Sequence, residues 1–250
     1  MSILKDKVAL VTGAGSGIGK QVALKYSAEG AKVIVSDIAE KGGNETVAEI
    51  KAAGGEAFFI KADTGSASDN EALVKQTIEK YGALHIACNN AGIGGPQQLT
   101  GEYPLEGWDK VIKINLSGVF YGMRYQLPAI LNSGGGNIVN MASILGKVGF
   151  AQSSAYVAAK HGVVGLTEAA AVEYAAKGVR INAVGPGFIK TPLVESSMDQ
   201  ASKDSLVALH PIGRLGESSE VAELVLWLSS DKASFVTGSY YNVDGGYLAR

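Results

Sequence analysis

The stretch Lys7-Val-Ala-Leu-Val-Thr-Gly-Ala-Gly-Ser-Gly-Ile-Gly19 joins an apolar run to a glycine-rich loop, and it decides the fold class. Residues 7–12 predict a buried strand, and residues 18–29 predict a helix. Glycines between the two let the backbone turn tightly and approach a phosphate group without a clash from Cβ. The N–H groups and the positive dipole end at the start of the helix favour an anion there. The stretch therefore predicts a strand, a phosphate-binding loop and a helix in succession.

Two other phosphate-binding patterns do not fit this loop. A Walker A loop here needs glycine at position 14 and Ser or Thr at position 21, where the chain has Ala14 and Gln21. A strict G-x-G-x-x-G pattern from Gly13 needs glycine at position 18, where the chain has Ile18. The order of strand, glycine loop and helix is the one that dinucleotide binding requires, and a glycine turn without a ligand is the alternative.

Beyond this stretch, short apolar runs alternate with longer helical patterns. Further strands are expected at residues 31–37, 56–62, 84–89, 137–142, 179–184 and 239–243. Helices are expected from the second strand to about residue 53 and at residues 66–81, 108–131, 153–177 and 217–230. This alternation predicts an α/β fold, a doubly wound parallel sheet of about seven strands with helices on both faces.

The whole chain, residues 1–250, is expected to form a single domain, because no linker or change of composition divides it. Residues 188–216 are the least regular stretch. Their charged and small residues are expected to form a flexible flap over the substrate.

Composition narrows the class of protein. The net charge of −2 predicts no surface for nucleic acid or an anionic membrane. The sequence shows no signal peptide and no apolar run long enough for a membrane span, so a cytoplasmic location is expected. A single cysteine, Cys88, excludes a disulfide within the chain, and three scattered histidines match no metal-ligand spacing, so no metal is expected.

Asp37 ends the second predicted strand, twenty residues after Gly17. At this place a carboxylate can accept both ribose hydroxyls of an adenosine and repel a 2′-phosphate, so Asp37 predicts NAD(H) in preference to NADP(H). The alternative is a helix capping box formed by Asp37 and Glu40. Lys20 and Lys41 are the nearby cations that leave NADP(H) open.

Tyr156 and Lys160 lie four residues apart in a predicted helix, which places the phenol and the ammonium on one face. A cation roughly 6 Å from the phenol lowers its pKa by about two units at an effective dielectric constant near 20. The pair therefore predicts a tyrosine prepared for proton transfer. An exposed pair without function is the alternative.

Several further elements accompany this pair. They are Thr12-Gly-Ala-Gly-Ser-Gly-Ile-Gly19, Asp63, Asn89-Asn-Ala-Gly92, Asn115, Ser143, Tyr156-Val-Ala-Ala-Lys160, Pro186-Gly187, Thr191 and Asp244-Gly-Gly246. In this order and at these separations they resemble the short-chain dehydrogenase/reductase family over the whole chain. The resemblance implies a Rossmann fold, a nicotinamide cofactor and oxidoreductase activity.

The resemblance also implies four catalytic residues. Tyr156 would protonate a carbonyl oxygen or take the proton of an alcohol. Lys160 would lower the pKa of Tyr156 and bind the nicotinamide ribose, and Ser143 would hold the substrate oxygen. Asn115 would anchor a water in a proton relay through Lys160 by interrupting regular helix geometry.

The resemblance further implies two sets of binding residues. The cofactor set is Gly13, Ser16, Gly17, Ile18, Gly19, Asp37, Ile38, Asp63, Thr64, Asn90, Ala91, Gly92, Tyr156, Lys160, Pro186, Gly187, Ile189 and Thr191. The substrate set is Ser143, Leu145, Phe150, Tyr156 and Phe188. Asp63 could instead be a loop or N-cap residue, and Asn89 is expected to join neighbouring strands.

The expected pocket wall is mainly apolar, which favours an uncharged hydrophobic ketone or secondary alcohol. In this the chain resembles bacterial NAD-dependent carbonyl reductases and secondary-alcohol dehydrogenases. A 3-oxoacyl-[acyl-carrier-protein] reductase and a sugar or polyol dehydrogenase are alternatives, and a non-catalytic NAD-binding regulatory protein is an alternative of another class. The family resemblance also implies a homotetramer.

Overall fold

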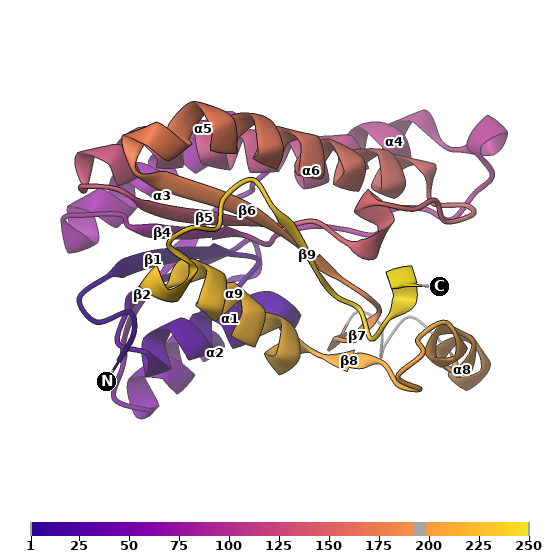
Figure 1. Ribbon diagram of the computed structural model, residues 1–250, viewed down its shortest axis with the longest axis horizontal. Helices are drawn as coiled ribbons and strands as arrows, with labels where there is room; N and C mark the ends of the chain where they lie inside the picture. The colour runs from indigo at the N-terminus through magenta and orange to yellow at the C-terminus, as the bar shows by residue number, and fades with distance from the viewer. Residues whose placement is uncertain (1, 193–198, 250) are drawn as a thin grey trace.

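The computed structural model describes residues 2–192 and 199–249. Its centre is a seven-stranded parallel sheet with the order β3-β2-β1-β4-β5-β6-β9 (Figure 1). The strands are β1 (Val8–Thr12), β2 (Lys32–Asp37), β3 (Glu56–Lys61), β4 (Ile86–Asn89), β5 (Gly136–Met141), β6 (Val179–Pro186) and β9 (Tyr240–Val243). The predicted α/β class with a doubly wound parallel sheet is confirmed.

The direction of strand addition reverses beside β1. From β1 the chain moves outward to β2 and β3, and it then returns to place β4 on the other side of β1. The carboxyl ends of β1 and β4 therefore border the crevice where sheets of this kind bind ligands. The glycine loop follows β1, and Asn90 follows β4, so both lie at this crevice.

Helices cover both faces of the sheet (Figure 1). On one face lie α1 (Gly17–Ala28), α2 (Glu40–Ala52) and α9 (Ser218–Ser229), and on the other lie α3 (Ala67–Tyr81), α4 (Leu105–Ile112), α5 (Gly118–Asn132) and α6 (Ser154–Tyr174). Successive strand residues point to opposite faces, so Val11 packs toward α1 and Leu10 packs toward the other layer. A large core therefore lies on each face of the sheet.

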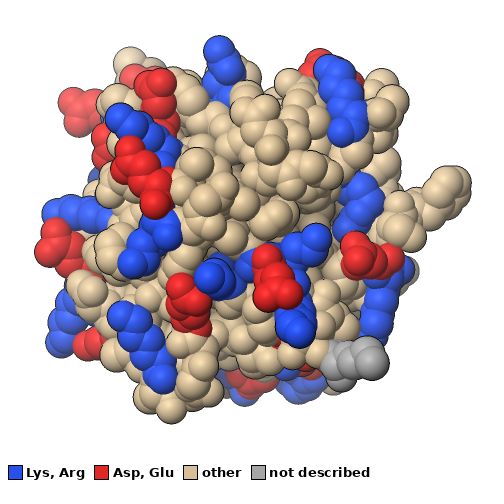
Figure 2. All heavy atoms as spheres, turned by 90° about the vertical axis from the view of Figure 1, so that its left-hand side faces the viewer, with Lys and Arg blue, Asp and Glu red and all other residues tan. Residues whose placement is uncertain are grey.

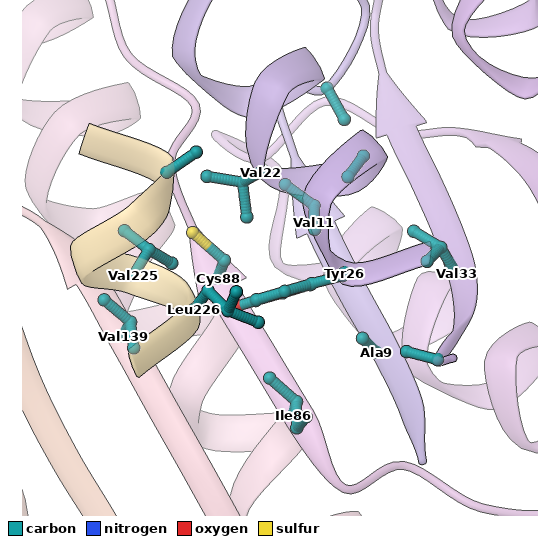
Figure 3. Packing of buried hydrophobic residues seen from close by; sticks show 14 of the residues in the cluster. Ala9, Val11, Val22, Tyr26, Val33, Ile86, Cys88, Val139, Val225 and Leu226 are labelled. Carbon is teal, nitrogen blue, oxygen red and sulfur yellow. The ribbon is translucent and has the colours of Figure 1, made fainter. Parts of the chain in front are cut away.

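The core between the sheet and helices α1 and α9 is shown in Figure 3. Tyr26 of α1 crosses it, and the phenol oxygen lies 2.6 Å from Ser229 Oγ. This contact satisfies two hydroxyl groups that burial would otherwise leave without a partner. Cys88 of β4 is fully buried in the same core, and burial raises the pKa of its thiol to about 12.

The predicted helix at residues 108–131 is interrupted in the structure. α4 ends at Ile112, a π-helical segment spans Lys113–Ser117, and α5 begins at Gly118. Asn115 lies inside this segment and is fully buried. The expected interruption of helix geometry around Asn115 is therefore confirmed. Such short π-helical turns are frequent at functional sites.

The stretch treated as an irregular flap contains regular elements. β7 (Ile189–Lys190) pairs with β8 (Gly216–Glu217), and α8 (Gln200–Ala208) lies between them in the sequence. Strands of two residues have no side-chain period by which a sequence could predict them. Residues 193–198 lie outside the described residues, and the flexibility of the flap stays a prediction.

Lysines and arginines are mixed with aspartates and glutamates on the face shown in Figure 2. Several charges form ion pairs, among them Lys32 with Glu56 at 3.3 Å and Lys25 with Glu223. This mixing leaves no field of a single sign over that face. None of the described helices has the length and apolar character needed to cross a bilayer.

Candidate active site

The loop after β1 depends on its glycines because the backbone is crowded. Gly13 and Gly17 have positive φ angles of 62° and 51°, which disfavour a side chain. A Cβ on Gly19 would clash with the Gly13 carbonyl oxygen and with Asn90 Nδ2. Asn90 donates this Nδ2 to the carbonyl oxygens of Thr12 and Gly13, at 2.9 and 3.2 Å. Asn90 therefore holds the loop from the end of the neighbouring strand.

The first turn of α1 opens onto this loop. No acidic side chain lies in that turn, and Ser16 makes no side-chain cap with the described residues there. The first N–H groups of a helix have no partner within the helix, so these donors suit an anion. The chemistry of this cradle fits the pyrophosphate of a dinucleotide, which residues 16–19 would hold.

The Asp37 carboxylate is fixed by two backbone N–H groups. Asp37 Oδ2 accepts from Gly15 at 2.8 Å, and Oδ1 accepts from Ala39 at 2.8 Å. The N-cap of α2 is Ala39, and it receives no side-chain cap, so the capping-box alternative is wrong. The carboxylate is instead bound to the glycine loop, beside the exposed side chain of Ile38.

The two cations that left NADP(H) open both have carboxylate partners. Lys20 Nζ lies 2.6 Å from Glu49 Oε2. Lys41 Nζ lies 4.0 Å from Glu45 Oε1. A 2′-phosphate would have to compete with these carboxylates and with Asp37 for either lysine.

The loop after β3 holds Asp63 and Thr64, the residues expected near the adenine. Asp63 Oδ1 accepts from the Gly65 N–H at 2.8 Å, and the Thr64 carbonyl accepts from Asn70 Nδ2 at 2.9 Å. The structure thus gives Asp63 the loop contact named as its alternative role. Contact with the adenine stays a prediction.

Tyr156 and Lys160 lie on the first turns of α6. Lys160 Nζ is 5.5 Å from the centre of the Tyr156 ring, so the two side chains lie on one face of the helix as predicted. The ammonium donates to the Met141 carbonyl at 2.7 Å, and the side chain is only 3% exposed. Burial lowers the pKa of Lys160 from 10.5 to about 8.

The expected low pKa of Tyr156 needs correction. Burial raises the pKa of the phenol, and a hydrogen bond with the Ser143 hydroxyl lowers it by less. The attraction of Lys160 alone favours a low pKa of Tyr156, but in the folded protein both groups also lose the water around them. In a low-dielectric site this loss opposes the phenolate as well as the ammonium.

Ser143 follows β5, where a 3₁₀ turn (Ile144–Gly146) begins. The side chain caps this turn by accepting from the Leu145 N–H at 3.2 Å. Because the end of β5 adjoins the start of α6, Ser143 also reaches the Tyr156 phenol. The structure therefore brings together the two hydroxyl groups expected to face one substrate oxygen.

Asn115 binds the chain just beyond β4. Its Oδ1 accepts from the Ile93 N–H and its Nδ2 donates to the Ile93 carbonyl, each at 2.8 Å. A Cβ on Gly92 would lie 3.2 Å from Asn115 Oδ1 and 3.8 Å from Lys160 Nζ. Asn115, Gly92 and Lys160 thus meet in one place, and the water relay stays a prediction.

The segment after β6 closes the crevice from the other side. A Cβ on Gly17 would lie 3.4 Å from Thr191 Cγ2, so Thr191 faces the glycine loop. Pro186 and Ile189 are buried on either side of Gly187. Their contact with the nicotinamide, which the resemblance implies, stays a prediction, as does that of Ala91, which is partly buried after β4.

Leu145, Phe150 and Phe188 are the apolar residues expected to contact substrate, and they make up the predicted apolar wall. Leu145 is buried in the turn that Ser143 caps, and the Phe150 and Phe188 rings lie 5.8 Å apart between centres. In the described part of the chain, no three His, Cys, Asp or Glu side chains cluster as metal ligands do.

A family model described as enoyl-(acyl carrier protein) reductase matches residues 13–248 of this chain. The chain is also 55% identical over 245 residues to a cyclohexanol dehydrogenase of Acinetobacter sp. (strain SE19), covering 98% of this chain and 96% of that protein. The chain belongs to the short-chain dehydrogenase/reductase family. The predicted oxidoreductase class, acting between secondary alcohol and ketone, is confirmed.

Two further relatives match this short-chain dehydrogenase/reductase along its length. A 2,5-dichloro-2,5-cyclohexadiene-1,4-diol dehydrogenase of Sphingobium indicum is 43% identical over 252 residues, covering 100% of both chains. A crystal structure of levodione reductase superposes with a TM-score of 0.95 at 40% identity, covering 98% of this chain and 99% of the other.

His210 and Tyr247 of this short-chain dehydrogenase/reductase lie beside Phe188, a contact that the sequence did not predict. His210 is buried, and its Nε2 accepts from the Phe188 N–H at 3.2 Å, so its Nδ1 carries the proton and donates to Leu206. The Tyr247 ring lies 5.6 Å from the His210 ring. A lone histidine and a terminal tyrosine carry no sequence signal for this contact.

Proposed function

We propose that this protein is an NAD(H)-dependent dehydrogenase that interconverts uncharged alicyclic secondary alcohols and ketones. The observation that carries the proposal is the meeting of Ser143, Tyr156 and Lys160 beside an apolar wall. The names of two relatives, cyclohexanol dehydrogenase and a cyclohexadiene-1,4-diol dehydrogenase, share a six-membered carbon ring that bears hydroxyl groups. Such a ring suits a wall of leucine and phenylalanine.

The chain's own groups would divide the work of alcohol oxidation. The Tyr156 phenolate takes the hydroxyl proton while the Ser143 hydroxyl holds the same oxygen. Lys160, when charged, favours that phenolate and offers N–H groups to the nicotinamide ribose. The bound nicotinamide supplies the acceptor for the hydride that leaves the carbinol carbon. In ketone reduction Tyr156 returns the proton to the oxygen.

A panel of substrates with NADH or NAD+ tests this function, read from the absorbance of NADH. Cyclohexanone and cyclohexanol should exceed an open-chain ketone and alcohol of equal carbon number by about tenfold in kcat/KM, because a rigid ring fills the pocket better. Faster turnover of a 3-oxoacyl thioester or of a polyol would contradict the alicyclic assignment. NADH binding without any turnover would indicate the regulatory alternative.

Replacing Asp37 by alanine is expected to lower the preference for NADH over NADPH by about 10- to 100-fold in kcat/KM. Charge-assisted hydrogen bonds to the ribose contribute about 1.5–3 kcal/mol, and the repulsion of a 2′-phosphate is lost with the carboxylate. The measurement is the ratio of kcat/KM for the two cofactors. Glu40→Ala, which removes a nearby exposed carboxylate that pairs with Lys61, is the matched control and should leave the ratio unchanged. A wild-type protein that prefers NADPH would refute the assignment.

We also propose a homotetramer, as the family resemblance implies. Large apolar side chains lie exposed on the helices of one layer, and Leu105 is 81% exposed. Trp108, Phe120 and Val172 are exposed on the same layer. Patches of this kind mark association surfaces. A cytoplasmic location stays a prediction.

A further inference from the structure

Tyr240, on the outer strand β9, reaches across to the predicted catalytic serine. Its hydroxyl donates to the Ser143 carbonyl oxygen at 2.7 Å, although the two residues lie 97 positions apart. The same carbonyl accepts from the Gly146 N–H at 2.8 Å. Two donors from separate elements therefore fix the peptide group of Ser143.

The neighbouring strand leaves room for this phenol. Gly185 of β6 lies beside it, and a Cβ at that position would clash with the Tyr240 hydroxyl. Tyr240 pairs with Ala183 in the sheet, so its ring extends along β6 toward the carboxyl end where Ser143 lies. A glycine within a strand weakens it, and here it accommodates the tyrosine.

The surroundings of Tyr240 keep its hydroxyl protonated. Burial raises the pKa of the phenol, and the negative charges of Asp244 and of an ionised Tyr156 raise it further. Lys147 Nζ lies 5.1 Å from the ring centre, in a cation–π contact that orients the ring. The hydroxyl therefore remains a donor to Ser143 over the working pH range.

We infer that Tyr240 is a positioning residue that holds Ser143 so that its hydroxyl meets the Tyr156 phenol. Ser143 leaves β5 with an extended backbone, φ −176° and ψ 161°. Its hydroxyl and the carbonyl that Tyr240 binds belong to the same residue. A tilt of that peptide group would move the hydroxyl away from Tyr156. The inference rests on the proposed function, in which Ser143 and Tyr156 share one substrate oxygen.

Tyr240→Phe tests this role, because it removes one oxygen and keeps the ring. We expect kcat to fall about tenfold, with KM for NADH unchanged, since the lost hydrogen bond is made to the Ser143 peptide group and not to the glycine loop. The Ser143 hydrogen bond lowers the Tyr156 pKa, so a displaced Ser143 raises it. The pH profile of alcohol oxidation should therefore move to higher pH.

The control for this test is Tyr241→Phe. Tyr241 is the next residue on β9, and its ring packs against Trp227 at 6.2 Å between centres. Adjacent strand residues point to opposite faces, so this change removes a hydroxyl of the same kind directed away from Ser143. It should change neither kcat nor the pH profile. Equal effects of the two variants, or an unchanged Tyr240→Phe enzyme, would overturn the inference.

A second readout separates this inference from the proposed function. Tyrosinate absorbance is followed as the pH is raised, in a protein and in its Tyr156→Phe variant. The difference between the two titrations gives the pKa of Tyr156 without any turnover. Among the described residues, the titratable groups near Tyr156 are Lys160, Tyr103 and Tyr240, and those near Tyr240 are Lys147 and Asp244. The Tyr240→Phe protein and its Tyr156→Phe variant form the second pair for this measurement. Both keep all of these groups except Tyr240. If the wild type turns over no alcohol, the proposed function fails. A Tyr156 pKa that is higher in the Tyr240→Phe protein than in the wild type still supports the inference in that case. An unchanged Tyr156 pKa refutes the inference.

Discussion

Replacing Tyr156 by phenylalanine is expected to reduce turnover by about 10³-fold or more, while the Kd for NADH changes less than about threefold. A general acid or base contributes about 10²–10⁴-fold, and in the proposed mechanism only Tyr156 carries the transferred proton. The ring that packs against Val111 and Ala155 is retained, so the start of α6 keeps its shape. The loss should therefore appear in kcat.

Steady-state kinetics in both directions, with NADH binding measured by its fluorescence, check this expectation. Tyr174→Phe makes the same change at the end of the same helix, where Lys177 lies over the ring, and should leave kcat unchanged. Substantial turnover by the Tyr156→Phe enzyme would show that the proton comes from another group.

Replacing Lys160 by methionine is expected to lower kcat at least about 100-fold and to stabilise the fold at pH 7. A cation that favours the Tyr156 phenolate is lost, which accounts for the activity. Burial lowers the pKa of Lys160 from 10.5 to about 8. This shift means that folding destabilises the ammonium form by about 3 kcal/mol. The Met141 carbonyl loses a hydrogen bond in return, at about 1–2 kcal/mol. The net gain in the free energy of unfolding is about 1–2 kcal/mol.

The dependence of this gain on pH distinguishes it from other causes. Between pH 8 and 10.5 the unfolded wild type holds a proton on Lys160 that the folded protein has released, so wild-type stability rises with pH. The advantage of the methionine variant should therefore be full below pH 8 and shrink as the pH approaches 10.5. Urea unfolding at pH 7 and pH 10 measures it, and Lys177→Met, at an exposed position, is the control. An advantage that grows with pH would contradict the role of the buried charge.

Local patterns of sequence were sufficient to predict the sheet and most of its helices. Apolar strands such as β1 are buried on both faces and leave a continuous signal, and the glycine loop identifies the turn that follows. The β7–β8 pair and the π-helical turn could not be predicted in this way. The first is too short to have a period, and the second differs from an α-helix only in its hydrogen bonds.

The candidate site was predictable where spacing along one element brings groups together, as for Tyr156 and Lys160. The approach of Ser143 to Tyr156 came from the family resemblance, because it joins two elements. Tyr240 and His210 act through contacts between segments far apart in the chain, and no local pattern predicts such contacts. The predicted downward shift of the Tyr156 pKa was wrong for a related reason, because burial is a property of the whole fold.

The position of Cys88 has a consequence for how the protein can be labelled. Thiolates are the form that reacts with maleimides and disulfide reagents, and a fully buried thiol with a pKa of about 12 supplies almost none. Cys88 is also the chain's single cysteine, at the centre of the main sheet. Its modification therefore requires β4 to separate from its covering helices. The rate of thiol labelling therefore measures how often the helices over β4 separate from it, without an engineered probe.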